Sequence, residues 1–451
     1  MATPATANDT SLGPRSEAAF ARARAVFPDG TTRVTIERSP APRYMSHGEG
    51  AYLVDVDGRR FLDLNANFTT LIHGHAFGPV ISTLERQLRR GSCFANPTEP
   101  EIALAELLCA RVPGLERVRF VNTGTEAVMF AIKAARALTG RSGVAKIEGA
   151  YHGAYDWVEV SQASTPATWG AGDAPASTGY YAGMPQAVLD DVVALRFNDA
   201  EGARRLLAAH ADRLACVIID PMPSRAGLVA PEPGFIAALQ ETARAHGILV
   251  ISDEVLNFRQ AYEGASARYG IAPDLFTFGK IIGGGMPIGA IGGSAVTMKV
   301  FDASGGRPAL PQGGTFSANP LSMVAGLASM QALDRPAFAH LDDLGARLRA
   351  RLTEIIARRR APLTVTGAAS LFRIHPKRVA PRDFRESFTS PAETKVVVAL
   401  SRHFAEAGIV LPAAACACLS TPMTASEIDL IAQVFASFID RHGDLLAEIA
   451  R

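Results

Sequence analysis

Short apolar runs alternate with longer helical stretches through the middle of the chain, from about residue 80 to residue 320. The apolar runs are rich in valine, isoleucine and phenylalanine, and they lie at 117–122, 143–147, 215–220, 248–253 and 275–279. Helical stretches such as 126–138 and 235–246 separate them. Strands that are apolar at successive positions are typical of a parallel sheet covered by helices on both faces. The pattern therefore predicts an α/β domain.

The two ends of the chain follow other patterns. Residues 51–64 alternate around Asp57-Gly58, which predicts a small antiparallel hairpin with a two-residue turn. After about residue 320 the alternation of strands and helices stops, and further helices indicate a smaller α/β domain. We expect an N-terminal segment that joins the small domain, a large domain and a C-terminal small domain, with the bounds 1–75, 76–325 and 326–451.

Composition and charge narrow the class of protein. The 451 residues are 48% apolar and 20% charged, which is an ordinary balance for a soluble globular protein. The net charge of +1 gives no basic surface for nucleic acid or membranes, and no apolar run approaches the ~20 residues of a spanning helix. The N-terminus lacks a signal-peptide pattern, and five scattered cysteines fit a reducing compartment. We expect a cytoplasmic protein.

A lone lysine, Lys280, lies between the apolar run at 275–279 and a stretch rich in glycine. The nucleotide-binding P-loop needs a Ser or Thr after its lysine, but Ile281 follows here, and the G-x-G-x-x-G pattern fails at Ile288. A lysine in a dry pocket has a lowered pKa and forms Schiff bases readily. The alternative is a surface lysine on a loop.

A turn of threonine and glycine follows the run that ends at Asn122. Thr123, Gly124 and Thr125 precede a helix that is expected to begin at Glu126. Free backbone N–H groups at a helix N-terminus bind anions, and threonine hydroxyls add donors. The alternative is a simple helix cap with a glycine turn.

Two further strand ends carry polar or aromatic side chains. Asp253 closes the run at 248–253, where a carboxylate needs a cationic partner because its burial is otherwise costly. Tyr151 and His152 follow the run at 143–147, and the tyrosine ring could stack on a flat ligand. The alternatives are a structural ion pair or helix cap for Asp253, and simple packing for the other two residues.

Taken together, these groups suit one cofactor. Pyridoxal phosphate needs a lysine for its aldehyde, an acid for its ring nitrogen, an anion site for its phosphate and a face for its ring. In an open parallel sheet, ligands bind at the carboxyl ends of the strands, where all four groups are expected.

Five segments of the chain resemble the class III aminotransferases of fold type I, in the branch of glutamate-1-semialdehyde aminomutase and the β-amino-acid aminotransferases. The segments occur in family order, and they are NTGTEAVMFAIKAAR, EGAYHGAYD, ISDEVLNFR, TFGKIIGGGMPIGAIGG and QGGTFSANPLSMVAG. The resemblance covers about residues 15–440. It implies a large domain with a mostly parallel sheet and a smaller α/β domain formed by both ends of the chain.

The resemblance also implies a role for each residue of the site. Lys280 would hold pyridoxal phosphate as a Schiff base and carry the proton between the substrate Cα and the cofactor. Asp253 would pair with the ring nitrogen, while Val255 and Tyr151 would pack on the two ring faces. The other expected cofactor contacts are Thr123, Gly124, Thr125, His152 and Thr315. Thr315 would reach the phosphate of the neighbouring subunit, which implies an obligate homodimer with shared active sites.

The same resemblance suggests the substrate. Arg33 aligns with an arginine that holds a substrate carboxylate, so a carboxylate-bearing amine, including a β-amino acid, is expected as donor and a 2-oxo acid as acceptor. The alternative is the intramolecular aminomutase, whose glutamate would fall at Ala414 or Ala415. Its absence argues against the mutase. Arg225 either holds a substrate group or is an ordinary loop residue, which the sequence favours.

Two other features complete the sequence pattern. The segment 163–185 is a long loop, and loops of that length are often lids or binding loops. His73-Gly74-His75 could suggest a metal, but two histidines without a third ligand are weak support. We expect these histidines near the site entrance or in packing, and no metal.

Overall fold

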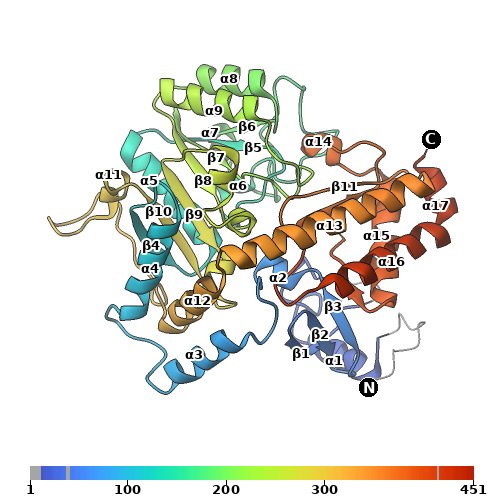
Figure 1. Ribbon diagram of the computed structural model, residues 1–451. Coiled ribbons are helices and arrows are strands. Elements are labelled where there is room, and N and C mark those ends of the chain that lie inside the picture. Colours follow the sequence, from blue (N-terminus) through green and yellow to red (C-terminus); the bar gives the residue numbers. More distant parts are fainter. Residues whose placement is uncertain (1–11, 37–40, 414–415, 451) are drawn as a thin grey trace.

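The computed structural model describes residues 12–36, 41–413 and 416–450, and a seven-stranded sheet lies at its centre (Figure 1). In spatial order its strands are β4 (Arg117–Val121), β10 (Gly289–Gly293), β9 (Leu275–Gly279), β8 (Leu249–Asp253), β7 (Leu214–Ile219), β5 (Gly143–Ile147) and β6 (Val192–Leu195). Strands β5 to β9 pair in parallel, whereas β10 runs antiparallel to both of its neighbours. The sheet is therefore mostly parallel, as expected, with one reversed strand.

The reversed strand β10 comes from the glycine stretch after Lys280. Residues 289–293 of this stretch form a fully buried strand that the sequence analysis did not predict. A Cβ atom on Gly289 would lie 2.0 Å from the backbone oxygen of Thr123, and one on Gly292 would lie 2.2 Å from Leu115 Cδ1. These glycines serve close packing, because larger side chains would collide with the neighbouring strand and loop.

Helices cover both faces of this sheet, as the apolar strands predict. Alternate residues of β7 and its neighbours pack on α5 (Gly124–Thr139), and the others pack on α8 (Ala200–Ala209) and α9 (Pro233–Ala245). In β7, for example, Cys216 and Ile218 belong to the α5 core, and Val217 and Ile219 to the opposite core. Burial on both faces explains why the strands are apolar at successive positions.

The two ends of the chain share a second sheet. Its strands, in spatial order, are β1 (Met45–Glu49), β2 (Tyr52–Asp55), β3 (Arg60–Asp63) and β13 (Ile409–Val410), and β13 runs parallel to β3. The expected hairpin is present as β2 and β3, but its turn is longer than two residues: Asp55 N donates to Arg59 O at 2.9 Å. Asp55 Oδ1 accepts from Arg59 N at 2.8 Å, so its side chain stabilises the longer turn. Both ends of the chain thus contribute strands to one sheet, and the bounds of the domains stay a prediction.

A third, three-stranded sheet and long helices complete the C-terminal part. The sheet contains β11 (Thr364–Thr366), β12 (Leu371–His375) and β14 (Ala417–Cys418). Helix α12 (Pro320–Ala332) leads into α13 (Arg335–Arg359), which extends from the large sheet across the C-terminal part beside α16 (Ala425–Arg441) (Figure 1). One apolar core runs from β9 to α16 and joins the two parts.

The remaining helical segments are short or lie at the surface. They are α1 (Pro14–Arg24), α2 (Ala66–Thr69), α3 (Gly78–Leu88), α4 (Glu99–Arg111), α6 (Asp156–Glu159), α7 (Gln186–Asp191), α10 (Ala265–Tyr269), α11 (Ala295–Met298), α14 (Phe384–Ser387), α15 (Pro391–Glu406), α17 (Gly443–Glu448) and the 3₁₀ turns η1 (Asn257–Gln260), η2 (Lys280–Gly283) and η3 (Lys299–Phe301). In the described part of the chain, none of the helices combines the length and apolar character that a bilayer crossing requires.

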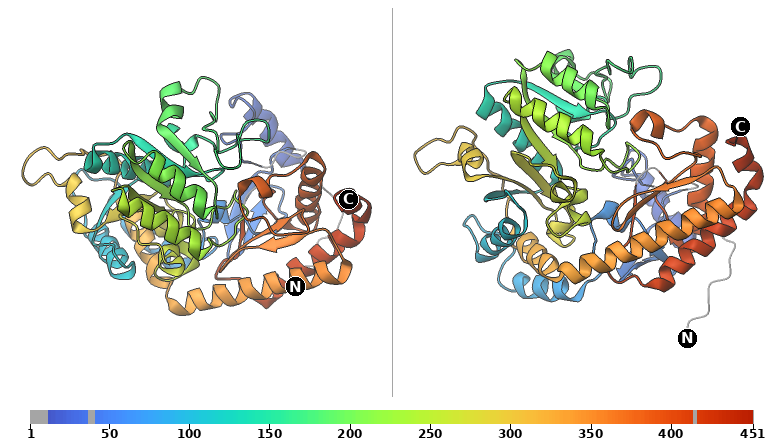
Figure 2. Two further views of the ribbon diagram at one scale, coloured as in Figure 1. Left: turned by 90° about the horizontal axis from the view of Figure 1, so that it is seen from above. Right: turned by 45° about the horizontal axis from the view of Figure 1, so that its top comes forward.

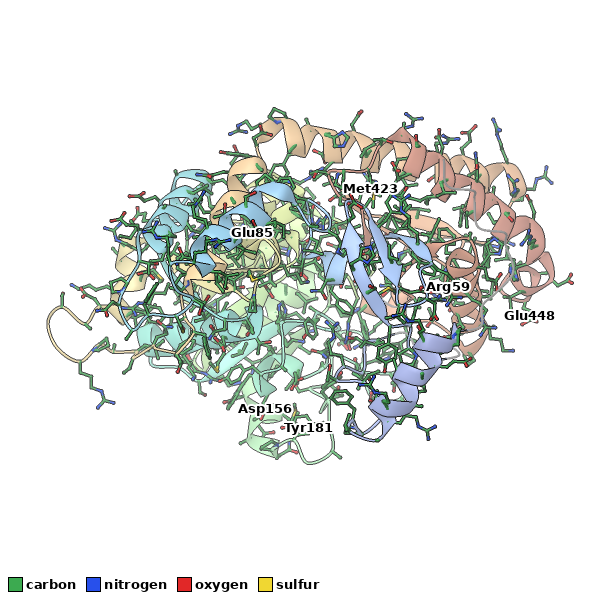
Figure 3. The ribbon with its side chains drawn as sticks, turned by 90° about the horizontal axis from the view of Figure 1, so that it is seen from below. Arg59, Glu85, Asp156, Tyr181, Met423 and Glu448 are labelled. Carbon is green, nitrogen blue, oxygen red and sulfur yellow. The ribbon has the colours of Figure 1, made fainter. Side chains whose placement is uncertain are left out.

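The long loop 163–185 is tied down along its length. Arg385 of α14 donates to the backbone oxygens of Trp169, Gly170 and Ala171 at 2.6, 3.1 and 3.2 Å. Farther along, Tyr181 Oη donates to Asp156 Oδ1 at 3.0 Å, and Figure 3 shows these two side chains together at the edge of the molecule. The loop is thus anchored to both the large and the C-terminal parts.

Candidate active site

The carboxyl ends of four neighbouring parallel strands meet at one edge of the large sheet. Strands β5, β7, β8 and β9 lie side by side, and the candidate residues Tyr151, His152, Asp253 and Lys280 end or follow three of them. Asp220 follows the fourth, β7. The fold therefore gathers the residues that the sequence singled out at strand ends.

Asp253 is the most firmly held side chain of this edge. Its Oδ2 lies 2.7 Å from His152 Nδ1, and its Oδ1 accepts from Thr277 Oγ1 at 3.0 Å and from Val255 N at 3.1 Å. Three hydrogen-bond partners fix the direction in which this side chain points. The predicted cationic partner is thus replaced by a histidine and two neutral donors.

His152 acts as a neutral donor. Burial lowers the pKa of His152, although the Asp253 carboxylate opposes that shift. A neutral ring that donates through Nδ1 leaves Nε2 as an acceptor, and this Nε2 is buried without a partner among the described residues. The arrangement holds Asp253 in place without adding a formal positive charge.

The environment of Lys280 favours a reactive, unprotonated amine. It lies directly after β9 with a positive φ of 50°, a conformation that costs a non-glycine residue energy and is often found at functional sites. Burial lowers the pKa of Lys280, while nearby Cys416, Asp253 and Asp220 act in the opposite direction. No described residue forms an ion pair or hydrogen bond with its ammonium group. A lowered pKa increases the unprotonated fraction, which is the nucleophile.

Asp220 is a buried acid that the sequence analysis did not place in the site. Burial, together with the neighbouring Asp253, raises the pKa of Asp220 well above its usual range. Its side chain contacts Asn257 Nδ2, and its Oδ1 accepts from Met222 N at 3.0 Å. The only sequence signal was its position at the end of an apolar run, which it shares with Asp253.

The N-terminus of α5 forms an open cradle. Thr123 Oγ1 accepts from Glu126 N at 3.1 Å, so this side chain is a helix cap, the alternative that the sequence left open. The N–H groups of Gly124 and Thr125 have no acceptor among the described residues. A Cβ on Gly124 would lie 2.9 Å from Val255 Cγ1, so only glycine fits between the helix and Val255. The two free N–H groups suit an anion.

Tyr151 lies in the loop after β5, and Thr125 contacts the same loop. Thr125 Oγ1 accepts from Ala154 N at 3.2 Å, and a Cβ on Gly153 would collide with the same oxygen at 2.3 Å. Tyr151 is 49% exposed, and the guanidinium of Arg225 lies 5.5 Å from the centre of its ring. An exposed ring beside Lys280 and Asp253 leaves a face for a ligand.

Arg33 lies against the strained turn of α2. The four residues of α2 all have positive φ, from 46° to 71°, although none is glycine. Arg33 Nη1 donates to Asn67 Oδ1 at 3.3 Å and its guanidinium lies 5.7 Å from the ring of Phe68. Ala66 of the same turn packs in one cluster with Cys416, which is close enough to influence Lys280. Arg33 thus contacts a turn that packs near Cys416.

Thr315 lies apart from these residues within the same chain. It is exposed and lines an open hollow of about 610 Å³ together with Cys93, Phe94 and the residues that precede α12. Phe94 and the adjoining Phe316 are 48% and 60% exposed. No contact of Thr315 with Asp253 or Lys280 is present.

The histidine pair belongs to the packing. His73 Nε2 lies 2.9 Å from Ser329 O, its ring stacks on Phe77, and His75 Nε2 lies 2.8 Å from Asp63 Oδ2. Cys416 and Cys418 are buried. Ala414 and Ala415, the positions compared with the mutase glutamate, lie outside the described residues.

Pyridoxal phosphate fits the residues that are present. The unpaired N–H groups of Gly124 and Thr125 are suited to its phosphate, and the unpartnered amine of Lys280 to its aldehyde. Asp253 offers a carboxylate for the ring nitrogen. Thr277 was missed from sequence because it lies inside a strand, and Asp220 because a strand-end position was its only signal.

Comparison with known proteins agrees with this geometry. The model of the aminotransferase class-III family matches residues 35–439. An omega-transaminase from Sphaerobacter thermophilus superimposes with a TM-score of 0.92 at 48% identity, over 95% of this chain and 98% of that chain. A β-phenylalanine aminotransferase from Variovorax paradoxus gives a TM-score of 0.86 at 32% identity, over 96% of both chains.

A curated relative carries the name of the mutase. Glutamate-1-semialdehyde 2,1-aminomutase of Chloroflexus aggregans is 39% identical over 365 residues, which cover 79% of this chain and 81% of that protein. Transaminases and the mutase share the fold and the cofactor, so the family is decided, whereas the substrate is not. The chain belongs to the class-III aminotransferases, and it is a transaminase of fold type I that depends on pyridoxal phosphate.

Proposed function

We propose that this aminotransferase takes its amino group from a carboxylate-bearing amine, with β-amino acids among its donors, and passes it to a 2-oxo acid in two half-reactions. The observation that carries the proposal is the contact of Arg33 with Asn67 of α2 at 3.3 Å, since Ala66 of α2 packs with Cys416, which influences Lys280. An arginine binds carboxylate through two parallel hydrogen bonds, so a substrate carboxylate would be oriented there.

The roles of the other residues follow from their positions. Bound pyridoxal phosphate supplies a ring that accepts electrons from the substrate. Lys280 would hold it covalently and then move a proton at the substrate Cα, for which its lowered pKa is suited. Asp253, fixed by His152 and Thr277, would hold the positive charge of the ring nitrogen.

The remaining contacts complete the pocket. Gly124 and Thr125 would bind the phosphate through their N–H groups, with Thr123 capping the helix that presents them. Val255, which lies against Gly124, would pack on one ring face and Tyr151 on the other. Both packing residues exclude water from the reacting centre.

A β-amino acid donor is supported by a relative. The Variovorax paradoxus protein is named as a β-phenylalanine aminotransferase and shares 32% identity over 96% of this chain. The mutase remains the second candidate, because the relative from Chloroflexus aggregans carries that name at 39% identity. The alanines at 414 and 415, where the mutase glutamate would fall, favour the transaminase.

One experiment separates these two candidates. The yellow holoenzyme is mixed with α-amino acids, β-amino acids, simple amines or glutamate-1-semialdehyde, without any 2-oxo acid, and its absorbance is followed. Bleaching by β-amino acids, reversed by a 2-oxo acid, is the expected result. Product formed from the semialdehyde without an acceptor would instead identify the mutase. Bleaching by simple amines alone would remove the carboxylate requirement.

We propose further that the enzyme is a homodimer whose sites are shared through Thr315. Support comes from the open hollow beside Thr315, with two exposed phenylalanines, and from the segment between η3 and α12, which projects from the body in both views of Figure 2. Phe94 lines the hollow and Phe316 adjoins its lining residues, and exposed apolar rings favour contact with a second chain. A cytoplasmic location is proposed on the five free cysteines.

Mixing two inactive variants tests the shared site. Lys280→Ala subunits keep Thr315, and Thr315→Val subunits keep Lys280, so a mixed dimer would contain one complete site. Refolding or exchanging the two variants together should restore about a quarter of the wild-type activity. Mixtures no more active than the separate variants, in a protein shown to be dimeric by light scattering, would refute the sharing.

A further inference from the structure

Arg225 is held at the edge of the site by the loop that follows β7. Its guanidinium lies 5.5 Å from the ring of Tyr151, and Nη1 donates to Gln162 O at 3.4 Å. Its backbone oxygen accepts from Ser387 Oγ at 2.8 Å, which fastens the loop to α14. Because β7 lies between β5 and β8, this loop adjoins those that carry Tyr151 and Asp253.

The charge of Arg225 is not balanced by a carboxylate. Among the described residues it forms no ion pair, whereas two other arginines that bridge the same parts of the molecule do so. Arg385 lies 2.7 Å from Glu148 Oε2, and Arg196 Nε lies 2.9 Å from Asp383 Oδ2. The difference matters because a partly buried guanidinium without a counter-charge is costly.

A second arginine stands beside the first. Arg373 of β12 donates to Ser224 O at 2.6 Å, one residue before Arg225, and it too pairs with no carboxylate of the described residues. Burial lowers the pKa of Arg373 to about 10, and the positive charge of Arg225 contributes to that shift. The large sheet and the small domain thus each contribute one cation to the same place.

The acids nearby cannot supply the missing charge. Glu148 is bound to Arg385, and Asp253 is bound to His152. Burial raises the pKa of Asp220 well above its usual range, and its side chain is bound to Met222 N and Asn257 Nδ2. An anion at Arg225 must therefore come from a ligand.

We propose that Arg225, supported by Arg373, binds the distal carboxylate of a dicarboxylic 2-oxo acid, so that the acceptor is a compound such as 2-oxoglutarate rather than pyruvate. The proposal rests on the proposed function, in which Arg33 holds the carboxylate next to the reacting carbon. Arg33 comes from the N-terminal segment and Arg225 from the loop after β7, so the two arginines are separate sites for two carboxylates. A dicarboxylate engages both, and a monocarboxylate only one.

The first test compares two acceptors in the second half-reaction. The amino form of the enzyme is mixed with 2-oxoglutarate or with pyruvate, and kcat/KM is measured for each. Arg225→Gln should lower the ratio of 2-oxoglutarate to pyruvate by about 10- to 100-fold, the effect of losing one charge-assisted carboxylate contact. Arg225→Lys, which keeps the charge but not the planar fork, should lower it less. Arg204→Gln, on the surface of α8, is the matched control.

The second test does not depend on turnover. Calorimetry measures how the purified holoenzyme binds glutarate and pentanoate, two unreactive acids of equal length with two carboxylates and one. The wild type should prefer glutarate, and Arg225→Gln and Arg373→Gln should remove that preference. If the panel experiment finds no transaminase activity, this titration still decides whether the second carboxylate site exists.

Three results would overturn the proposal. An unchanged ratio of kcat/KM for 2-oxoglutarate and pyruvate in Arg225→Gln would show that Arg225 does not bind the distal carboxylate. Equal binding of glutarate and pentanoate by the wild type would show that the protein has no site for the second carboxylate. A changed absorbance spectrum of the bound cofactor in Arg225→Gln, with unchanged acceptor selectivity, would assign Arg225 to the cofactor. If Arg225→Gln does not fold, both tests are made with Arg225→Lys and Arg373→Gln instead.

Discussion

The two sides of this active site are built in different ways. Asp253 and Lys280 lie at the ends of adjacent strands, and Asp253 is fixed by three hydrogen bonds of 2.7–3.1 Å. Arg33 and Arg225 lie on loops, are exposed or half-buried, and are held by contacts of 3.3 and 3.4 Å. The proposed cofactor side is thus rigid, while the proposed substrate side is assembled from distant segments.

This difference explains why one fold serves several reactions. Chemistry that needs an exact position is best supported by strand ends in a packed sheet. Loops tolerate substitution without loss of the core, so substrate preference changes there first.

The largest expected effect is on the rigid side, at its reactive amine. Lys280→Ala should reduce turnover by at least about 1,000-fold, because both covalent attachment and proton transfer are lost. Activity is measured with the best donor of the panel, and the link to the cofactor by borohydride reduction and mass spectrometry. Lys299→Ala, an exposed lysine nearby in sequence, is the control and should leave both unchanged. Full activity in Lys280→Ala would remove the residue from the mechanism.

A smaller loss is expected at the carboxylate. Asp253→Asn keeps the shape but removes the charge that would hold the ring nitrogen protonated, so the rate of the first half-reaction should fall by about 100-fold. Thr277→Val removes one of the three donors to Asp253 and should cost about 1 kcal/mol, or a few-fold in rate. A Thr277→Val effect as large as that of Asp253→Asn would mean that Thr277 has a role of its own.

On the loop side, Arg33 should discriminate between substrates. Arg33→Gln should lower kcat/KM for amino acids by about 10-fold or more, and lower it much less for simple amines of the same size. Arg22→Gln, an exposed arginine of α1, serves as the control. Equal losses for both substrate classes would show that Arg33 supports the fold and not the carboxylate.

The smallest effect on turnover is expected at Lys146, whose ammonium group holds the loop after β5 on the rigid side. Lys146 Nζ donates to the backbone oxygens of Ile147, Ala150 and Val160 at 3.3, 3.2 and 2.8 Å, which bracket the loop that carries Tyr151 and His152. Burial lowers the pKa of Lys146 to about 7 from the 10.5 of a free lysine. Between these values the unfolded chain keeps a proton that the folded protein has released.

The free energy of unfolding should therefore depend on pH through this residue. The wild type should gain about 1.4 kcal/mol per pH unit relative to Lys146→Met as the pH rises from 7 towards 10. Below pH 7 both states of the wild type are protonated, so the difference should level off. Urea unfolding of both proteins at pH 6, 8 and 9.5 measures it. A difference that does not change with pH would show that Lys146 stays charged when folded.

Much of the fold and half of the site were readable from residue pattern and motif. The five expected strands, their helices and the strand-end positions of Asp253, His152 and Lys280 are present, because parallel strands carry their carboxyl ends to one edge. Strand β10 was missed, since glycine alone predicts flexibility and not a crowded sheet. The hairpin turn is longer than expected because Asp55 folds back on it.

The sequence by itself determined the family and identified the residues of the proposed cofactor side. These residues follow apolar strands, which the local pattern of residues predicts. Only the tertiary structure decided which groups meet across the chain: His152 with Asp253, Asp220 with Asn257, and Arg225 with Arg373. These meetings depend on how distant segments pack and on how burial shifts protonation. The residues next to a given residue in sequence determine neither the packing of distant segments nor the effect of burial on protonation.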